Sequence, residues 1–197
     1  MTWHSASAAA AVVALFISSA AARAADIEAG RARAQACAAC HGNEGHSTNP
    51  AVPSLAGQPA QALATQLYQF REGNRKNEQM SPMAANLSNA EMNDLAAYFA
   101  SLKPAAPAHR TAPQNASAGP GLAKKFNCVQ CHGPRLEGQQ QMPRIAGQQY
   151  EYLLAQLRQF KAGKRADMDG NMTSAAQQLS DADIDVLVDY IAGLGAQ

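Results

Sequence analysis

Cys37-Ala38-Ala39-Cys40-His41 and Cys128-Val129-Gln130-Cys131-His132 are two copies of one pentapeptide, Cys-x-x-Cys-His, placed 91 residues apart. Together they contain all 4 cysteines of the 197-residue chain. Two cysteines followed directly by a histidine are typical of a c-type haem attachment site. On one helical turn both sulfurs can bond to the haem vinyl groups while the imidazole points at the iron. The motifs therefore predict two covalently bound haem c groups: Cys37 and Cys40 with axial His41, and Cys128 and Cys131 with axial His132.

Two other uses of paired cysteines fit the sequence less well. A redox dithiol of the thioredoxin type would stand between a strand and a helix, and no β-rich run is visible in this chain. A zinc site built from all four thiolates would leave both histidines without a role, and the two cysteine pairs are far apart in sequence. Haem attachment accounts for the cysteines and the histidines together.

Residues 1–25 have the pattern of a cleaved signal peptide. Ala8 to Ala22 is an alanine-rich apolar run, and Ala22-Arg23-Ala24 is the small-x-small pattern of a signal-peptidase site. The apolar run is too short to span a bilayer, which disfavours an uncleaved membrane anchor. We therefore expect export to the periplasm, which agrees with the attachment of c-type haem outside the cytoplasmic membrane.

The charge balance excludes one class of partner. The chain has 16 Lys and Arg and 15 Asp and Glu, so removal of Arg23 with the signal peptide leaves a formally neutral polypeptide. Four haem propionates would make the haem-loaded protein mildly acidic. A nucleic-acid-binding protein needs a basic face, and we therefore expect no nucleic-acid partner.

The chain after the signal peptide is an internal duplication. Pro53–Gln58 and Pro143–Gln148 share the pattern Pro-x-Leu/Ile-Ala-Gly-Gln, and Gln66–Arg75 matches Gln156–Arg165. Gly30 and Gly121 each precede the first cysteine of their half by seven residues. The two halves therefore predict two domains of one fold.

The region between the halves, Pro104 to Ala118, contains Pro104, Pro107 and Pro113 and little that could form a core. Such a composition predicts an extended linker. The expected order is thus a signal peptide over 1–25, an N-terminal domain over 26–103, a linker over 104–118 and a C-terminal domain over 119–197.

Each half predicts three helices, which makes the fold all-α. The first helix is expected from about Gly30 or Gly121 into the cysteine motif, and the third begins at a capping box on Ser88 or Ser180. The second has apolar residues at helical spacing: Leu63, Leu67 and Phe70, repeated as Leu153, Leu157 and Phe160. Domains of fewer than about 80 residues rarely bury enough apolar surface to be stable alone. We expect the haem to supply the missing core.

The second axial ligand of each iron decides between electron transfer and ligand binding, because methionine raises the potential and an empty position permits catalysis. Counting back seven residues from Leu87 and Leu179, where the last helices start, gives Met80 and Met172. Both are expected in polar loops, where an apolar side chain needs a reason. The second-half loop is two residues longer, and Met83 and Met168 remain as alternatives.

Several further residues have open interpretations. A proximal imidazole needs an acceptor for its second nitrogen, and the carbonyls of Pro53 and Pro143, about a dozen residues after each histidine, could serve; a simple turn proline fits the spacing as well. Arg75 and Arg165, with Tyr68 in the first half, could bind haem propionates or be solvated charges. His46 and His109 are expected to be solvent-exposed and without a role.

The chain resembles the class I cytochromes c, and among them the dihaem cytochrome c4 family of bacterial periplasms. The resemblance covers nearly the whole mature chain. It depends on the Cys-x-x-Cys-His-Gly motifs, the two Pro-x-Leu/Ile-Ala-Gly-Gln segments, the two Gln-Leu-x-x-Phe-x-x-Gly stretches and the final Leu-Ser helices. It implies two all-α domains related by a pseudo-two-fold axis, His/Met ligation of each haem, and haem propionates that approach each other at the interface. It also implies that the carbonyls of Pro53 and Pro143 hold the proximal histidines.

The resemblance further implies the function of a respiratory electron shuttle, which is a carrier and not an enzyme. Members of the family pass electrons from a quinol-oxidising complex toward a terminal oxidase, some while attached peripherally to the membrane. The alternative from another class is a dihaem redox enzyme, either a peroxidase or a sulfur-compound dehydrogenase, or an electron-accepting subunit of one. An enzyme of that kind would need one haem with a vacant or labile position, whereas this sequence offers a methionine to each.

Overall fold

The computed structural model describes Met1 and residues 24–195, so nearly all of the expected signal peptide lies outside the described residues. The described chain contains helices and one isolated β-bridge between Gln139 and Met142, with no strand. The all-α prediction is confirmed for this part of the chain. The elements are α1 (Ile27–His41), η1 (Asn43–Gly45), α2 (Ala60–Arg71), α3 (Met80–Ala84), α4 (Asn89–Ser101), α5 (Pro113–Lys125), α6 (Cys128–His132), α7 (Tyr150–Lys161), α8 (Asn171–Gln177) and α9 (Asp181–Ala192).

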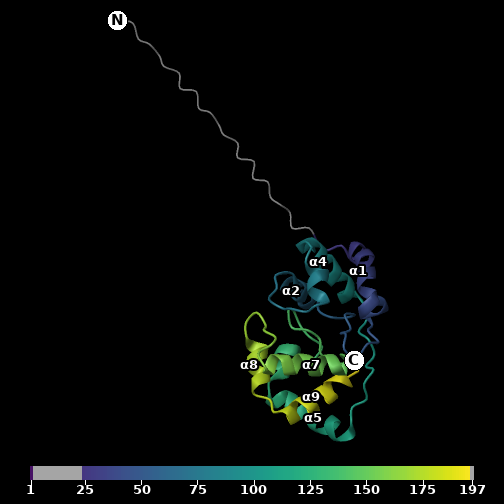
Figure 1. Cartoon of the computed structure of the whole chain (residues 1–197), viewed down its shortest axis with the longest axis vertical. Helices are drawn as coiled ribbons and strands as arrows, with labels where there is room; N and C mark the ends of the chain where they lie inside the picture. Colours follow the sequence, from purple (N-terminus) through teal and green to yellow (C-terminus); the bar gives the residue numbers. More distant parts are fainter. Residues whose placement is uncertain (2–23, 196–197) are drawn as a thin grey trace.

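The helices form two bodies that follow one another along the chain (Figure 1). In the first body α1 and α2 both pack on α4, and α3 packs on α2. In the second body α5 and α7 pack on α9, and α8 packs on α7. The last helix of each half is therefore the central support, and the short helices α3 and α8 occupy matching places beside the second long helix of each half.

Each body has a small core of its own. The buried residues of the central apolar cluster in the first are Ala34, Leu95, Tyr98 and Phe99. Those of the second are Ala123, Leu136, Ala146, Leu179, Ile184, Leu187, Val188 and Ile191. The apolar residues that the sequence assigned to the second helices, Leu63 and Leu67 with Leu153 and Leu157, are only partly buried against these cores. They leave apolar surface for a further apolar body.

Side-chain hydrogen bonds cap the first turns of α1, α4 and α9. The Asp26 carboxylate accepts bonds from the amides of Glu28 and Ala29 and so caps α1. Ser88 and Ser180 form reciprocal capping boxes with Glu91 and Asp183, as the sequence predicted. These caps satisfy amide groups that the first helical turn leaves without partners.

The last part of the segment predicted as an extended linker is helical in the structure. Pro113 to Ala118 do not belong to an extended linker, because they form the first part of α5. Proline is well tolerated at the first position of a helix, where its missing N–H is not needed. The linker proper covers residues 104–112 and runs along one side of both bodies (Figure 1).

The helix that leads into the second cysteine motif is also interrupted, contrary to the prediction. α5 ends at Lys125, and α6 begins at Cys128 after Asn127, which adopts a left-handed conformation with φ of 57°. Asparagine tolerates this region better than most residues. The second motif therefore lies on a separate helix of 5 residues, whereas the first lies on the last turns of the 15-residue α1.

Candidate haem sites and the domain interface

The two histidines of the motifs are buried at equivalent places. His41 ends α1 with 6% of its surface exposed, and His132 ends α6 with 8% exposed. Each is followed by a glycine at positive φ, 78° for Gly42 and 87° for Gly133, which turns the chain sharply away from the helix. A side chain at Gly42 would place its Cβ 2.0 Å from the His46 carbonyl oxygen. The glycine is therefore required by the turn.

The turn brings a proline carbonyl back to each imidazole. The Nδ1 atom of His41 lies 2.8 Å from the Pro53 oxygen, and that of His132 lies 2.8 Å from the Pro143 oxygen. A carbonyl accepts only from a protonated Nδ1, so Nε2 carries the free lone pair that a metal needs. Burial lowers the pKa of both His41 and His132, although the carbonyl bond opposes the shift. Both imidazoles are therefore neutral at pH 7 and suited to bind iron.

The cysteines of each motif differ in exposure. Cys37 and Cys128 are half-buried against the domain cores, whereas Cys40 and Cys131 are exposed. Burial raises the pKa of the Cys37 and Cys128 thiols, which disfavours a reactive dithiol of depressed pKa. The described residues also contain no group of three or more His, Cys, Asp or Glu side chains that could hold a metal ion. The zinc and dithiol interpretations therefore have no geometric support.

The predicted methionines lie on short helices and not in irregular loops. Met80 begins α3, and Met172 is in the first turn of α8. Their amides donate to side chains of the preceding turns, at 2.8 Å to Asn77 Oδ1 and at 2.7 Å to Asp167 Oδ2. Helix α3 packs on α2 and α8 packs on α7, whereas the histidines lie on α1 and α6. The candidate ligands of each iron thus come from different helices of one domain.

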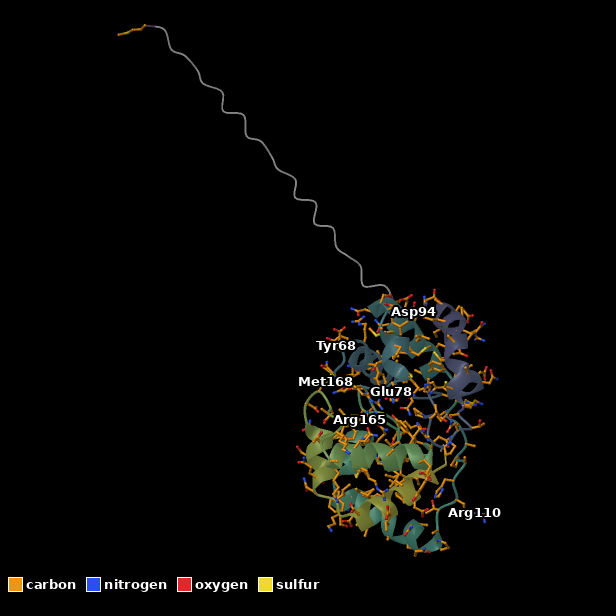
Figure 2. The ribbon with its side chains drawn as sticks, viewed as in Figure 1. Tyr68, Glu78, Asp94, Arg110, Arg165 and Met168 are labelled. Carbon is orange, nitrogen blue, oxygen red and sulfur yellow. The ribbon has the colours of Figure 1, made fainter. Side chains whose placement is uncertain are left out.

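Two arginines from different domains meet at the interface, and among the described residues neither forms a salt bridge, although the charge of Asp167 acts on Arg165. The guanidinium of Arg75 donates to Gln66 at 2.5 Å and to Gln156 at 2.9 Å. Arg165 donates to Gln156 at 2.5 Å and to Gln66 at 3.0 Å, and it lies at the boundary between the two bodies (Figure 2). Each guanidinium also covers the ring of a buried phenylalanine, 4.5 Å from the Phe70 centroid for Arg75 and 4.4 Å from that of Phe160 for Arg165.

This pair of cations provides a test of whether the residues fit a haem. Burial, followed by the charge of Arg75, lowers the pKa of Arg165 to about 10, and its Nε is a buried donor without an acceptor. Two neighbouring guanidiniums of this kind need anions. Haem propionates are such anions, and the partly buried Leu63, Leu67, Leu153 and Leu157 offer the apolar surface that a porphyrin covers. The residues therefore fit two haems with their propionates turned toward the interface.

Tyr68 does not take part in this cluster. Its side chain is 40% exposed at the outer edge of α2 (Figure 2) and lies under the Arg71 guanidinium at 5.4 Å. The tyrosine at the interface is Tyr152, whose hydroxyl accepts from Arg75 at 3.2 Å. Sequence comparison missed it because its counterpart in the first half is Ala62. The glutamines of the cluster were detectable, since Gln66 and Gln156 recur at equal places on otherwise apolar helix faces.

A second set of interface contacts joins the Pro-x-Leu/Ile-Ala-Gly-Gln segments. Gln58 Nε2 donates to the Arg144 carbonyl at 2.8 Å, and the Arg144 amide donates to Gln58 Oε1 at 2.9 Å. Gln148 makes the same pair of bonds with Ser54, at 2.9 Å and 2.8 Å. Gln58 and Gln148 are equivalent in the repeat, as are Ser54 and Arg144, so the contacts are reciprocal as in a two-fold interface.

The fold and these sites place the chain in the class of proteins that contain two cytochrome c domains in tandem. The sequence model of the cytochrome c family matches residues 27–103 and 116–195. The cytochrome c4 of Thiocapsa roseopersicina is 39% identical over 181 residues, with 86% of this chain and 93% of the relative covered. The thiosulfate dehydrogenase electron acceptor of Thiomonas intermedia (strain K12) is 38% identical over 171 residues, covering 81% of this chain and 78% of the relative.

A solved structure agrees with these matches. Reduced recombinant cytochrome c4 from Pseudomonas stutzeri superposes with a TM-score of 0.80 at 34% identity, covering 87% of this chain and all of that one. The chain therefore belongs to the cytochrome c4 family of dihaem c-type cytochromes. It transfers electrons between redox protein partners, and the resemblance noted in the sequence is confirmed.

Proposed function

We propose that this protein is a periplasmic shuttle that holds up to two electrons, one on each haem. His41 and Met80 would bind the iron of the first haem, and His132 and Met172 that of the second. Cys37, Cys40, Cys128 and Cys131 would carry the thioethers. One observation supports this proposal above all. Each domain contains a buried, neutral histidine whose Nδ1 is hydrogen-bonded to a proline carbonyl.

When bound, each haem supplies reversible one-electron chemistry of iron. The chain's own part is to limit reorganisation. The Pro53 and Pro143 carbonyls fix the orientation of the imidazoles, and the apolar helix faces would exclude water from the haem pocket. Arg75 and Arg165 would neutralise propionates at the interface. With both axial positions filled, the protein would be a carrier without catalytic activity of its own.

The proposed donor is a quinol-oxidising complex and the proposed acceptor a terminal oxidase. No described helix is long and apolar enough to cross a membrane, and peripheral attachment to the membrane would serve the same exchange. Export would depend on the signal peptide proposed over residues 1–25, of which residues 2–23 lie outside the described part.

The Thiomonas relative gives one specific alternative, acceptance of electrons from a thiosulfate dehydrogenase. The exported protein should first be assayed for two haems per chain by pyridine haemochrome, and for low-spin ferric spectra with the sulfur-to-iron band. Its reduction by a quinol-oxidising complex and by a thiosulfate dehydrogenase should then be compared at equal concentrations. Faster reduction by the dehydrogenase would favour the alternative, and a high-spin haem or peroxide turnover would contradict the carrier.

A further inference from the structure

The interface glutamines contact the same peptide groups that hold the proximal histidines. The Pro53 carbonyl, which faces His41 Nδ1, and the Ser54 amide, which donates to Gln148, are the two ends of one planar peptide bond. The Pro143 carbonyl, which faces His132 Nδ1, and the Arg144 amide, which donates to Gln58, are likewise the two ends of one peptide bond. Each proximal histidine is thus two hydrogen bonds away from a glutamine of the opposite domain.

We propose that each glutamine sets the potential of the haem in the other domain. Gln148, in the C-terminal domain, acts on the haem of His41, and Gln58, in the N-terminal domain, acts on the haem of His132. Both are positioning residues that act through the Pro53–Ser54 and Pro143–Arg144 peptides. This inference rests on the proposed ligation of the irons by these histidines.

The physical basis is the polarisation of an amide. A hydrogen bond to the N–H of a peptide shifts electron density toward its carbonyl oxygen, and bonds linked in this way strengthen one another. A more negative Pro53 oxygen draws the Nδ1 proton of His41 more strongly. The imidazole then donates more charge through Nε2, which favours the ferric state and lowers the potential.

The surroundings favour a measurable effect. Gln58 is 7% exposed, Gln148 6% and Ser54 6%. The bonds between Gln148 and Ser54 are therefore shielded from water, and those between Gln58 and the half-buried Arg144 are partly shielded. The amide of each glutamine faces both polar groups of its target residue, as donor to the carbonyl and acceptor from the N–H. This bidentate arrangement holds the Oε1 atom on the N–H of the critical peptide.

The same coupling acts in the reverse direction. Linkage requires that a bond which stabilises the ferric state be itself stronger in the ferric state. Oxidation of one haem therefore strengthens the bond between its domain and the glutamine of the other domain. The oxidation state of each haem is thus coupled to the strength of a hydrogen bond between the domains, at Gln148 for one haem and at Gln58 for the other.

The first test is a crossed substitution in the full dihaem protein. Gln148→Met removes the bond to the Pro53–Ser54 peptide. We expect the ferrous-to-ferric ratio of the His41 haem to rise about threefold at a fixed potential. At about 59 mV per tenfold change, this corresponds to a rise of about 28 mV in its reduction potential. The His132 haem should not shift. Gln58→Met should raise the potential of the His132 haem and leave that of the His41 haem unchanged. The haems are distinguished by paramagnetic NMR, through contacts of their methyl groups with residues of each domain.

Gln149 offers a matched control. Its Nε2 atom also donates across the interface, at 2.6 Å to the Ser47 carbonyl, but that carbonyl is not part of a peptide bound to a histidine. Gln149→Met should therefore leave both potentials unchanged. Equal shifts of both haems in the Gln148 variant, a shift of only the His132 haem, or no shift would each overturn the inference.

A substitution could open the interface, which a larger radius of gyration in solution scattering would reveal. A second measurement on the wild-type protein then tests the inference without any substitution. Amide hydrogen exchange of Ser54 and Arg144 should be about threefold faster in the fully reduced than in the fully oxidised protein, by the reciprocity of coupling. The amides of Gly57 and Gly147, which donate within their own domains to Phe99 and Ile191 at 2.9 Å, should not change. Equal exchange of Ser54 in both states would overturn the inference.

These outcomes separate the inference from the proposed function. A protein with two low-spin haems but no crossed shift and no redox-dependent exchange remains an electron carrier without this coupling. A protein with fewer than two haems, or with a vacant axial position, contradicts the proposed function before the coupling is measured.

Discussion

Four methionines are candidates for the second axial position of the two haems, and they differ in exposure. Met83 is 52% exposed and Met168 is 70% exposed, whereas Met80 and Met172 are half-buried. A sulfur that binds iron in an apolar pocket must be turned away from water. The exposure therefore favours the two methionines that the repeat also selects.

Met80→Ala and Met172→Ala should each lower the potential of one haem and open it to added ligands such as imidazole. The expected fall is on the order of 0.1–0.3 V, within the range of about 0.8 V over which axial ligands set haem potentials. Redox titration and the ferric sulfur-to-iron band measure it. Met83→Ala and Met168→Ala are the controls, and loss of the band in either would transfer the ligand to that residue.

At the scale of elements, glycines decide how closely the first and last helices of each domain approach. A Cβ at Gly30 would lie 2.1 Å from the Asp94 carbonyl oxygen, and one at Gly119 would lie 2.2 Å from Cγ of Tyr190. Gly121, the position that sequence spacing pairs with Gly30, has nothing within 4 Å. The packing counterpart of Gly30 is therefore Gly119, because the interruption at Asn127 changes the spacing between helix and motif.

Gly30→Ala and Gly119→Ala should each destabilise the haem-loaded protein by about 1–3 kcal/mol, since the added methyl group meets backbone or an aromatic ring. Gly121→Ala should be neutral or stabilise by about 0.5–1 kcal/mol through helix propensity. Denaturant unfolding compares the three. Equal losses of unfolding free energy in Gly119→Ala and Gly121→Ala would show that α5 and α9 leave room for a methyl group at Gly119.

The carboxylate of Asp189 binds the end of the linker to the C-terminal domain. Asp189 Oδ1 pairs with His109 Nε2 at 2.6 Å, and Asp189 Oδ2 accepts from the Ala112 amide and from Asn115 at 3.0 Å. The His109 ring stacks on Tyr150 with centroids 4.7 Å apart. His109 is thus half-buried and not the solvent-exposed residue that the sequence suggested, and Asp189 fixes the chain where α5 begins.

Asp189→Asn should lower the free energy of unfolding at pH 7 by about 1–3 kcal/mol, as expected for bonds to a charged group. Burial raises the pKa of Asp189, but bonds from His109, Asn115 and Ala112 outweigh it and lower the pKa. A lowered pKa gives stability that is complete above the unfolded value of about 3.9 and is lost as the pH falls through the folded value.

The difference between the wild type and Asp189→Asn should therefore shrink between pH 5 and pH 3, as thermal unfolding across that range would show. Asp185→Asn is the control, because its carboxylate is 55% exposed and pairs with the exposed Arg158. An undiminished difference at pH 3 would mean that the carboxylate charge is not responsible.

At the scale of the whole molecule, the interface places one half-buried arginine from each domain beside the other. The bonds from Arg75 to Gln156 and from Arg165 to Gln66 cross between the domains, so each cation would lie near both expected sets of propionates. A cation stabilises the ferrous state, which carries one positive charge less at the iron than the ferric state. The pair should therefore raise both potentials together.

Arg165→Gln should lower both haem potentials by on the order of tens of millivolts, because a unit charge at about 10 Å and an effective dielectric constant of about 20 contributes about 1–2 kcal/mol. Potentiometric titration of the dihaem protein measures this. Lys164→Gln removes an exposed neighbouring charge that salt screens, and should change little. A potential shift in only one haem would contradict the claim that Arg165 acts on both.

The sequence by itself determined the haem motifs, the duplication, the helical class and the capping boxes at Ser88 and Ser180. All of these are encoded by residues within a few positions of one another, so local spacing is sufficient to detect them. The second long helices were predictable in the same way, from apolar residues at a period of 3.6.

Only the tertiary structure decided that α5 begins at Pro113, that Gly119 is the close-packed glycine, and that Gln58 and Gln148 each reach a peptide of the other domain. Asp189, for instance, meets Ala112 77 residues away along the chain. Such contacts depend on how helices pack within a domain and how the two domains pack together, because a side chain's partner across a packed surface is set by surface shape and not by its distance along the chain.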